Sequence, residues 1–142
     1  MAATLVLAVT LVGCENGYQT VPLVTGVPNS MKGTNGRVAC FTNSASGPLV
    51  TDPRYGTAII DMDTVKVMGL ASPLPPVPVA WRPGFTGRRV GSEVEVLDPQ
   101  GNVVAMTGRN YTIAGAGVDV KDMPGLPTNS AFWACDFVLP SE

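Results

Sequence analysis

Histidine is absent from the 142-residue chain, and charged residues make up only 14% of it. Without histidine, the chain lacks the commonest general base and the commonest transition-metal ligand of proteins. Ser-His-Asp catalysis, Cys-His catalysis and histidine-containing zinc sites are therefore excluded. No nucleophilic side chain is paired in the sequence with another base. We predict that the protein is not an enzyme and uses neither a metal nor another cofactor.

Positive charge is also scarce. Nine Lys and Arg residues stand against eleven Asp and Glu residues, which gives a formal net charge of -2. Proteins that bind nucleic acid usually carry a basic patch or stripe. Because this chain is slightly acidic, we expect no nucleic-acid partner.

The N-terminus has no apolar run of membrane-spanning length. The uncharged stretch from Ala2 to Gly13 is shorter than the roughly 20 residues that a membrane helix needs. Its length is typical of the core of a signal peptide, although no Lys or Arg precedes Lys32 to supply the usual positive start. The alternative is a buried β-strand over residues 4–12, which are rich in β-branched side chains.

The uncharged stretch ends at Leu11-Val12-Gly13-Cys14, and polar residues follow from Glu15. This tetrapeptide resembles the lipobox of bacterial lipoproteins. In that family the small residue before the cysteine admits the signal peptidase, and the cysteine carries a diacylglycerol. The resemblance implies a signal peptide over 1–13, lipidation of Cys14, and an extracytoplasmic location on the cell membrane or in the cell envelope.

Two further cysteines, Cys40 and Cys135, each lie in an apolar run with β-strand character. In an oxidising compartment such a pair predicts a disulfide, here between the first and last strands of the domain. Closing a loop of about 95 residues contributes about 4 to 5 kcal/mol in the chain-entropy model. The alternative is two buried free thiols that pack as small apolar side chains.

Glycine and proline are abundant, with 16 and 13 residues, and they interrupt most helical patterns. Residues 14–35 show no sustained apolar period, so we predict a flexible tether there, although residues 18–24 could instead add an edge strand. The folded β-domain is then expected over 36–142. One domain is the expectation for this length.

Within that domain, alternating apolar residues predict short strands at 37–42, 48–51, 57–60, 92–97, 103–107, 110–118 and 132–139. Turn residues predict turns at 43–47, 52–56 and 98–102 and a loop at 119–129. Residues 61–70 are ambiguous and lean towards strand, whereas 71–79 have too many prolines for a central strand. The predicted fold is all-β: a small antiparallel barrel, OB-like, or a sandwich of about five to seven short strands, closed by the disulfide.

A second resemblance concerns residues 79–117. The run Val79-Ala80-Trp81-Arg82-Pro83-Gly84-Phe85, the hairpin around Leu97-Asp98-Pro99-Gln100-Gly101 and the glycine-ended strand at Gly115-Ala116-Gly117 are similar to a pattern in small secreted bacterial proteins of unknown role. Those proteins look like five-stranded barrels of the OB type. The resemblance implies fold more than function, because such barrels serve many ligands.

Aromatic and cationic residues interleave only between Trp81 and Arg89. In an OB-like barrel they could form a face that stacks on a glycan or nucleotide and holds an anion. The candidate binding residues are Trp81, Arg82, Phe85, Arg88 and Arg89. In the alternative interpretation, Trp81 and Phe85 cap the core and the arginines are solvated.

We expect structural roles for the remaining acidic residues and methionines that could suggest a site. Asp61 and Asp63, with Asp52 nearby, lack the spacing of a calcium loop and are expected to be solvated carboxylates at strand ends. Glu93 and Glu95 are expected on the exposed face of a hairpin strand. The unclustered methionines are expected to fill the core sooner than to bind copper: Met62, Met68, Met106 and Met123.

The sequence thus predicts a non-enzymatic lipoprotein, anchored to a membrane by its lipid, which binds an envelope protein or cell-wall component. A phage-encoded lipoprotein that blocks superinfection is one concrete version. The alternative is a small-ligand or glycan-binding module that uses the aromatic and arginine residues named above.

Overall fold

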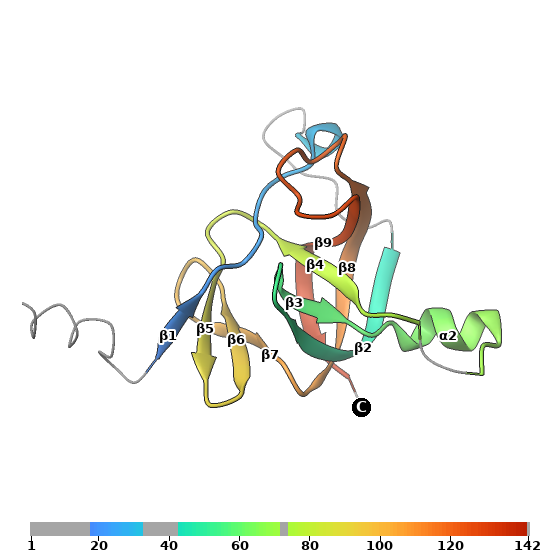
Figure 1. Ribbon diagram of the computed structural model, residues 1–142, viewed down its shortest axis with the longest axis horizontal. Coiled ribbons are helices and arrows are strands. Elements are labelled where there is room, and N and C mark those ends of the chain that lie inside the picture. The colour runs from blue at the N-terminus through green and yellow to red at the C-terminus, as the bar shows by residue number, and fades with distance from the viewer. Residues whose placement is uncertain (1–17, 33–42, 72–73, 142) are drawn as a thin grey trace, which may run out of the picture.

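The computed structural model describes residues 18–32, 43–71 and 74–141 (Figure 1). The lipobox cysteine Cys14, the cysteine Cys40 and the strand predicted over 37–42 lie outside the described residues. Among the residues described, no helix combines the length and apolar character that crossing a membrane requires.

Five strands close into a barrel in the order β2-β3-β4-β9-β8. Neighbouring strands are antiparallel except β4 and β9, which are parallel. The prediction of a β-barrel is therefore confirmed, with one parallel pair where an antiparallel barrel was expected. The bounds are β2 (Asn43–Asp52), β3 (Gly56–Ile59), β4 (Val77–Trp81), β8 (Asn110–Asp119) and β9 (Ser130–Pro140).

A second, antiparallel sheet has the order β1-β5-β6-β7. The predicted turn at 98–102 joins β6 to β7. The Asp98 side chain stabilises this turn by accepting hydrogen bonds from the backbone N–H groups of Gln100 and Asn102, each at 2.9 Å. Gly101 supplies the positive φ of 87° that this turn needs. The bounds are β1 (Gln19–Val21), β5 (Thr86–Val90), β6 (Glu93–Leu97) and β7 (Val103–Met106).

The segment 18–32 is folded onto the domain, so the prediction of a flexible tether is wrong for these residues. β1 adds an edge strand to β5, as the alternative for residues 18–24 predicted. Further along, Val24 and Gly26 exchange backbone hydrogen bonds with Trp81, at 2.8 and 2.9 Å. Val24 and Val27 also pack against buried residues of the domain. These contacts fix a segment whose sequence shows no strand or helix period.

Two clusters of buried side chains form the core. The first lies among the barrel strands and the second sheet and includes Leu49, Ile59, Trp81 and Ile113. The second is centred on Trp133 and lies against the segment 24–31 and the loop 120–129. The segment contains the 3-10 helix η3 (Asn29–Met31), and the backbone N–H of Asn29 donates a 2.7 Å hydrogen bond to the Asp122 carbonyl in the loop.

Cys135 is one of the fully buried residues of the second cluster. A disulfide needs its partner's α-carbon within about 7 Å, which a residue of a neighbouring strand provides. The partner expected from the sequence, Cys40, is not among the described residues. The bridge from Cys40 to Cys135 therefore stays a prediction.

The turn predicted over 43–47 is instead the first half of β2. Asn43 to Pro48 pair with Gly115 to Asn110 of β8. The side chains alternate, with Ala45 buried and Ser46 half-buried, where its hydroxyl meets that of Thr112 at 2.8 Å. Small polar residues that favour turns in isolation are tolerated here because the cross-strand partner satisfies them.

Residues 61–70, which lean towards strand in the sequence, form the helix α2 (Met62–Met68). The Asp61 side chain caps it by accepting hydrogen bonds from the backbone and hydroxyl of Thr64, and Gly69 ends it with φ 65°. Asp61 is thus a helix cap and not a solvated strand-end carboxylate.

Most side chains of α2 are exposed. Only Val65 is buried, whereas Val67 is 86% and Met68 62% exposed. The prediction that Met62 and Met68 fill the core is wrong, because a two-turn helix that contacts the barrel along a single side leaves them in solvent. Met123, in contrast, is in the core.

Candidate functional site

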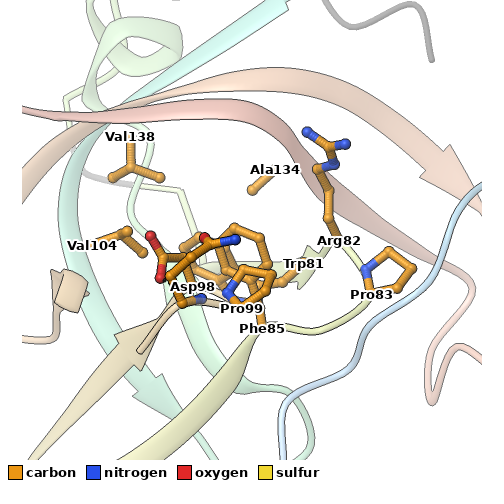
Figure 2. Close-up of a pocket in the computed structure, with 10 residues that line it drawn as sticks. Trp81, Arg82, Pro83, Phe85, Asp98, Pro99, Val104, Ala134 and Val138 are labelled. Atoms are coloured by element: carbon orange, nitrogen blue, oxygen red, sulfur yellow. Dashed lines mark hydrogen bonds between the residues drawn. The ribbon is translucent and has the colours of Figure 1, made fainter. Parts of the chain in front are cut away.

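A half-open pocket of about 450 Å³ lies at the junction of the barrel and the second sheet (Figure 2). One wall is the connection between β4 and β5, the opposite wall is the turn between β6 and β7, and β9 contributes the barrel side. The lining residues are Trp81, Arg82, Pro83, Phe85, Asp98, Pro99, Gln100, Val104, Ala134 and Val138.

Trp81 forms the floor of the pocket and is completely buried. Its indole N–H donates a 2.9 Å hydrogen bond to the hydroxyl of Thr57, and its ring stacks on Phe85 with centroids 5.8 Å apart. The Trp81 ring therefore presents no open face to a ligand. Phe85 is half-buried and is the aromatic ring that a bound group would meet.

The rim of the pocket carries charge of both signs. Arg82 is exposed, and one guanidinium N–H donates to the carbonyl of Cys135 at 3.2 Å. Asp98 and Gln100 come from the β6–β7 turn, on the opposite wall. The pocket thus combines apolar side chains with a cation on one side and a carboxylate on the other.

The Asp98 carboxylate is held in its charged form by the turn. The hydrogen bond from the backbone N–H of Asn102 does most to lower the pKa of Asp98 below its ordinary value of 3.8. Loss of solvent raises this pKa. The Asn102 side chain and the backbone N–H groups of Gln100 and Gly101 lower it further. A carboxylate with a lowered folded-state pKa stabilises the fold above the ordinary pKa, and this contribution is lost as pH falls through the folded-state pKa.

Replacing Asp98 with Asn is therefore expected to flatten the acid limb of the stability profile. In wild-type protein the urea midpoint should fall between about pH 5 and pH 2 in part because Asp98 becomes protonated, whereas Asp98→Asn should lose less over the same interval. Urea unfolding followed by tryptophan emission at several pH values measures this. Identical pH profiles for the two proteins would contradict the role given to the turn.

The structure places the five predicted binding residues at separate sites. Trp81, Arg82 and Phe85 line the pocket, but Arg88 and Arg89 lie elsewhere on β5. Arg88 forms a 2.7 Å ion pair with Glu95, and its guanidinium lies 4.3 Å from the centroid of the Tyr18 ring. Arg89 lines a different pocket, next to β1. Successive residues of a strand face opposite sides, so Arg88 and Arg89 cannot serve one site.

The two glutamates of β6 were expected on an exposed face, but the structure engages both of them in contacts with neighbouring strands. Glu95 is only 9% exposed, where Arg88 neutralises it. Glu93 accepts a 2.5 Å hydrogen bond from the hydroxyl of Thr107, which itself accepts one from the backbone N–H of Val94. Both carboxylates therefore hold neighbouring strands of the second sheet together.

Six of the ten residues that line the pocket lie outside residues 81–89, where the sequence predicted the site. Asp98, Pro99 and Gln100 had been assigned only a turn, and Val104, Ala134 and Val138 only strand positions. Their turn and strand patterns were readable, but no local signal indicates that a turn at 98–102 closes over residues 81–85. That contact depends on how the hairpin packs against the barrel.

Within the described ranges, no three His, Cys, Asp or Glu side chains are grouped so that they could hold a metal ion. Asp52 and Asp61 are both engaged by neighbouring backbone groups, Asp52 in the turn before Gly56 and Asp61 at the start of α2. Every buried side-chain nitrogen or oxygen in this part of the chain has a hydrogen-bond partner. The pocket, and not a cluster of chemically reactive groups, is the feature that suggests function.

No known protein family, curated protein sequence or solved structure matches the chain.

Proposed function

We propose that the protein is a non-enzymatic lipoprotein, anchored in the cell envelope through Cys14, whose barrel domain binds a protein partner at the pocket beneath Arg82. The observation that carries the binding role is the pocket itself, which combines apolar side chains with a charged residue on each of two walls. Ligand sites are usually concave, largely apolar and marked by a few placed polar groups. The closed barrel with a single parallel strand pair supports the OB-like interpretation, and barrels of that type display binding sites on their walls.

The shape of the pocket favours an apolar side chain of a polypeptide over a sugar ring. Glycan sites commonly offer a flat aromatic face, and the Trp81 face is covered by Phe85 and by the barrel. An apolar side chain would instead fill the space among Phe85, Val104 and Val138. Arg82 and Gln100 on the rim would then meet the carbonyl and N–H groups of the partner's backbone.

The anchor is tested by the intact mass of the protein extracted from the membranes of its host. We expect a mass equal to residues 14–142 plus a diacylglyceryl adduct, and two hydrogens lower if Cys40 and Cys135 are bridged. A Cys14→Ala chain should keep its N-terminal stretch and lose the adduct. An unmodified wild-type chain in the soluble fraction would overturn the lipoprotein assignment.

Charge reversal on the rim tests the pocket. In cells that express the wild-type gene, adsorption or DNA injection by at least one phage of a broad panel is expected to fall. Arg82→Glu should remove more than about 90% of this protection, because a carboxylate would replace a hydrogen-bond donor facing the partner's carbonyl groups, and repulsive contacts of this kind at an interface cost several kcal/mol. The matched control is Arg109→Glu, which reverses an exposed arginine outside the pocket lining and should keep the protection.

Two outcomes would count against this function. If no phage in the panel is affected by the wild-type protein, superinfection exclusion is removed as its concrete version. If Arg82→Glu and Arg109→Glu behave alike, the pocket is not the surface that the partner uses.

A glycan-binding module is the second candidate, favoured by Phe85, whose half-buried ring lines the pocket and is open to a stacking sugar. A sugar in the pocket would lie close enough to Trp81 to change its emission. Titration with cell-wall oligosaccharides should then give a saturable change that Phe85→Ala abolishes. A flat response across the oligosaccharide panel would leave the protein partner as the only proposal for this pocket.

A further inference from the structure

The folded part of the chain begins very close to Cys14. Tyr18 is the first described residue, and Gln19, Thr20 and Val21 already pair with β5. Four residue steps of fully extended chain span at most about 14 Å. If Cys14 carries the proposed lipid, the β1 end of the molecule has to remain within that distance of the membrane surface.

A second pocket, of about 420 Å³, opens at this end of the molecule. It lies between β1, which contributes Gln19 and Thr20, and the turn from β2 to β3, which contributes Asp52 and Arg54; Arg89 of β5 completes it. Gln19 and Arg89 are direct cross-strand partners. The pocket is therefore built on the strand that stands nearest to the proposed anchor.

The charges of this second pocket are unbalanced. The Asp52 carboxylate is occupied within its turn, where it accepts hydrogen bonds from the backbone N–H groups of Arg54 and Tyr55 at 2.7 and 3.0 Å and pairs with the Arg54 guanidinium at 3.2 Å. Arg89 forms no ion pair with any described residue and is exposed. The second pocket therefore holds two guanidinium groups and one carboxylate, which pairs with Arg54 alone, and the positive charge of Arg89 is left uncompensated.

We infer that this second pocket binds the phosphate of an anionic phospholipid headgroup in the membrane that holds the anchor. This rests on the proposed lipidation of Cys14. Guanidinium groups match phosphate oxygens with paired hydrogen bonds, and a phosphodiester supplies the single negative charge that balances Arg54, Arg89 and Asp52. The chain as a whole has a net charge of -2 and gives no general attraction to an anionic surface, so the local arrangement has to provide it.

Two further observations agree with this orientation. The Tyr18 ring, stacked under Arg88 and 39% exposed, directly precedes β1, and tyrosine is a residue type enriched at membrane interfaces. The helix α2 lies at the opposite end of the long axis from β1 (Figure 1). A molecule held at β1 would therefore extend away from the membrane and direct α2 towards other components of the envelope.

The test compares vesicle binding by full-length chains that differ only in surface charge. Sedimentation with vesicles of phosphatidylcholine, with and without about 30% phosphatidylglycerol, measures the preference for anionic lipid. Arg54→Gln/Arg89→Gln should weaken binding to the anionic vesicles by about five-fold per arginine removed. Lys66→Gln/Lys121→Gln removes the same charge from α2 and from the loop after β8 and should leave binding unchanged.

Arg54→Lys/Arg89→Lys keeps the charge but removes the paired guanidinium hydrogen bonds, so its binding should lie between that of the wild type and that of the glutamine variant. Binding above that of the glutamine variant separates an electrostatic effect from a loss of folding. Because the apolar N-terminal stretch is the same in all variants, it cancels in the comparison. Equal losses in Arg54→Gln/Arg89→Gln and in Lys66→Gln/Lys121→Gln, or no loss in either, would overturn the headgroup site.

The intact-mass measurement keeps the two proposals apart. A lipidated wild-type chain whose vesicle binding does not depend on Arg54 and Arg89 would leave the lipoprotein assignment standing and overturn the headgroup site. An unmodified chain would overturn both, because the limit of about 14 Å would then no longer hold the second pocket at a membrane.

Discussion

Gly115→Ala is expected to lower the free energy of unfolding by about 3 kcal/mol, the upper part of the usual range for overpacking a core. A β-carbon at this position would lie 1.9 Å from the carbonyl oxygen of Trp133 and 2.9 Å from the ring of Phe132. Gly115 stands where the register between β8 and β9 shifts, and the backbone of β9 occupies the space that a side chain would need there. The barrel could accommodate the methyl group only by separating the two strands.

Gly117→Ala is the matched control for this prediction. Gly117 lies two residues further along β8 and is exposed. Apart from its two chain neighbours, no described residue has an atom within 4 Å of the position that a β-carbon would take there. Its replacement should change stability by less than about 1 kcal/mol and could raise it, because alanine restricts the unfolded chain. Urea unfolding of both variants, followed by tryptophan emission, measures the difference. Similar losses for the two glycines would show that β8 and β9 do not approach as described.

Trp81→Ala is expected to be the other severe substitution, with a loss of about 3 to 5 kcal/mol. Total stabilities of domains are commonly about 5 to 15 kcal/mol, so this variant should be close to unfolded. Trp81 is fully buried, fills the barrel side of the first cluster and forms the floor of the candidate pocket. Its backbone also holds the segment at 24–26.

A double-mutant cycle separates packing from hydrogen bonding at Trp81. Trp81→Phe leaves the buried hydroxyl of Thr57 without its 2.9 Å donor, and Thr57→Val leaves the indole N–H without its acceptor. Each single variant should lose about 1 to 3 kcal/mol, whereas the double variant should lose less than the sum. Strict additivity would mean that this hydrogen bond contributes nothing to the fold.

The hairpin of β6 and β7 shows what could be predicted locally. Strand alternation over 92–97 and 103–107 and the turn residues between them gave both strands and their connection, because Asp98 and Gly101 act on groups no more than four residues away. The long β8 and β9 strands were found in the same way.

Among the predictions that failed, two did so for different physical reasons. Residues 43–47 carry turn chemistry, yet β8 pairs with them across more than 60 positions of sequence and makes them a strand. Residues 61–70 contain β-branched side chains, yet Asp61 and Gly69 cap them as a helix. In the first case a cross-strand partner decided the structure, and in the second the caps did.

The candidate pocket shows the same division. The sequence indicated Trp81, Arg82 and Phe85 because aromatic and cationic residues are adjacent there, and all three line the pocket. It also grouped them with Arg88 and Arg89, which the strand directs elsewhere. The opposite wall, from Asp98 to Gln100, entered the site only through the packing of the hairpin on the barrel.

By itself, the sequence determined the β class, the main turns and the exclusion of histidine chemistry, because composition and short-range turn geometry act within a few residues. Only the tertiary structure decided that the barrel closes through a parallel pair of β4 and β9, that residues 18–32 pack against Trp81 and Trp133, and that two separate pockets divide the predicted arginines. These features depend on hydrogen bonds and side-chain contacts between segments far apart in the chain, and such contacts exist only once the strands have closed.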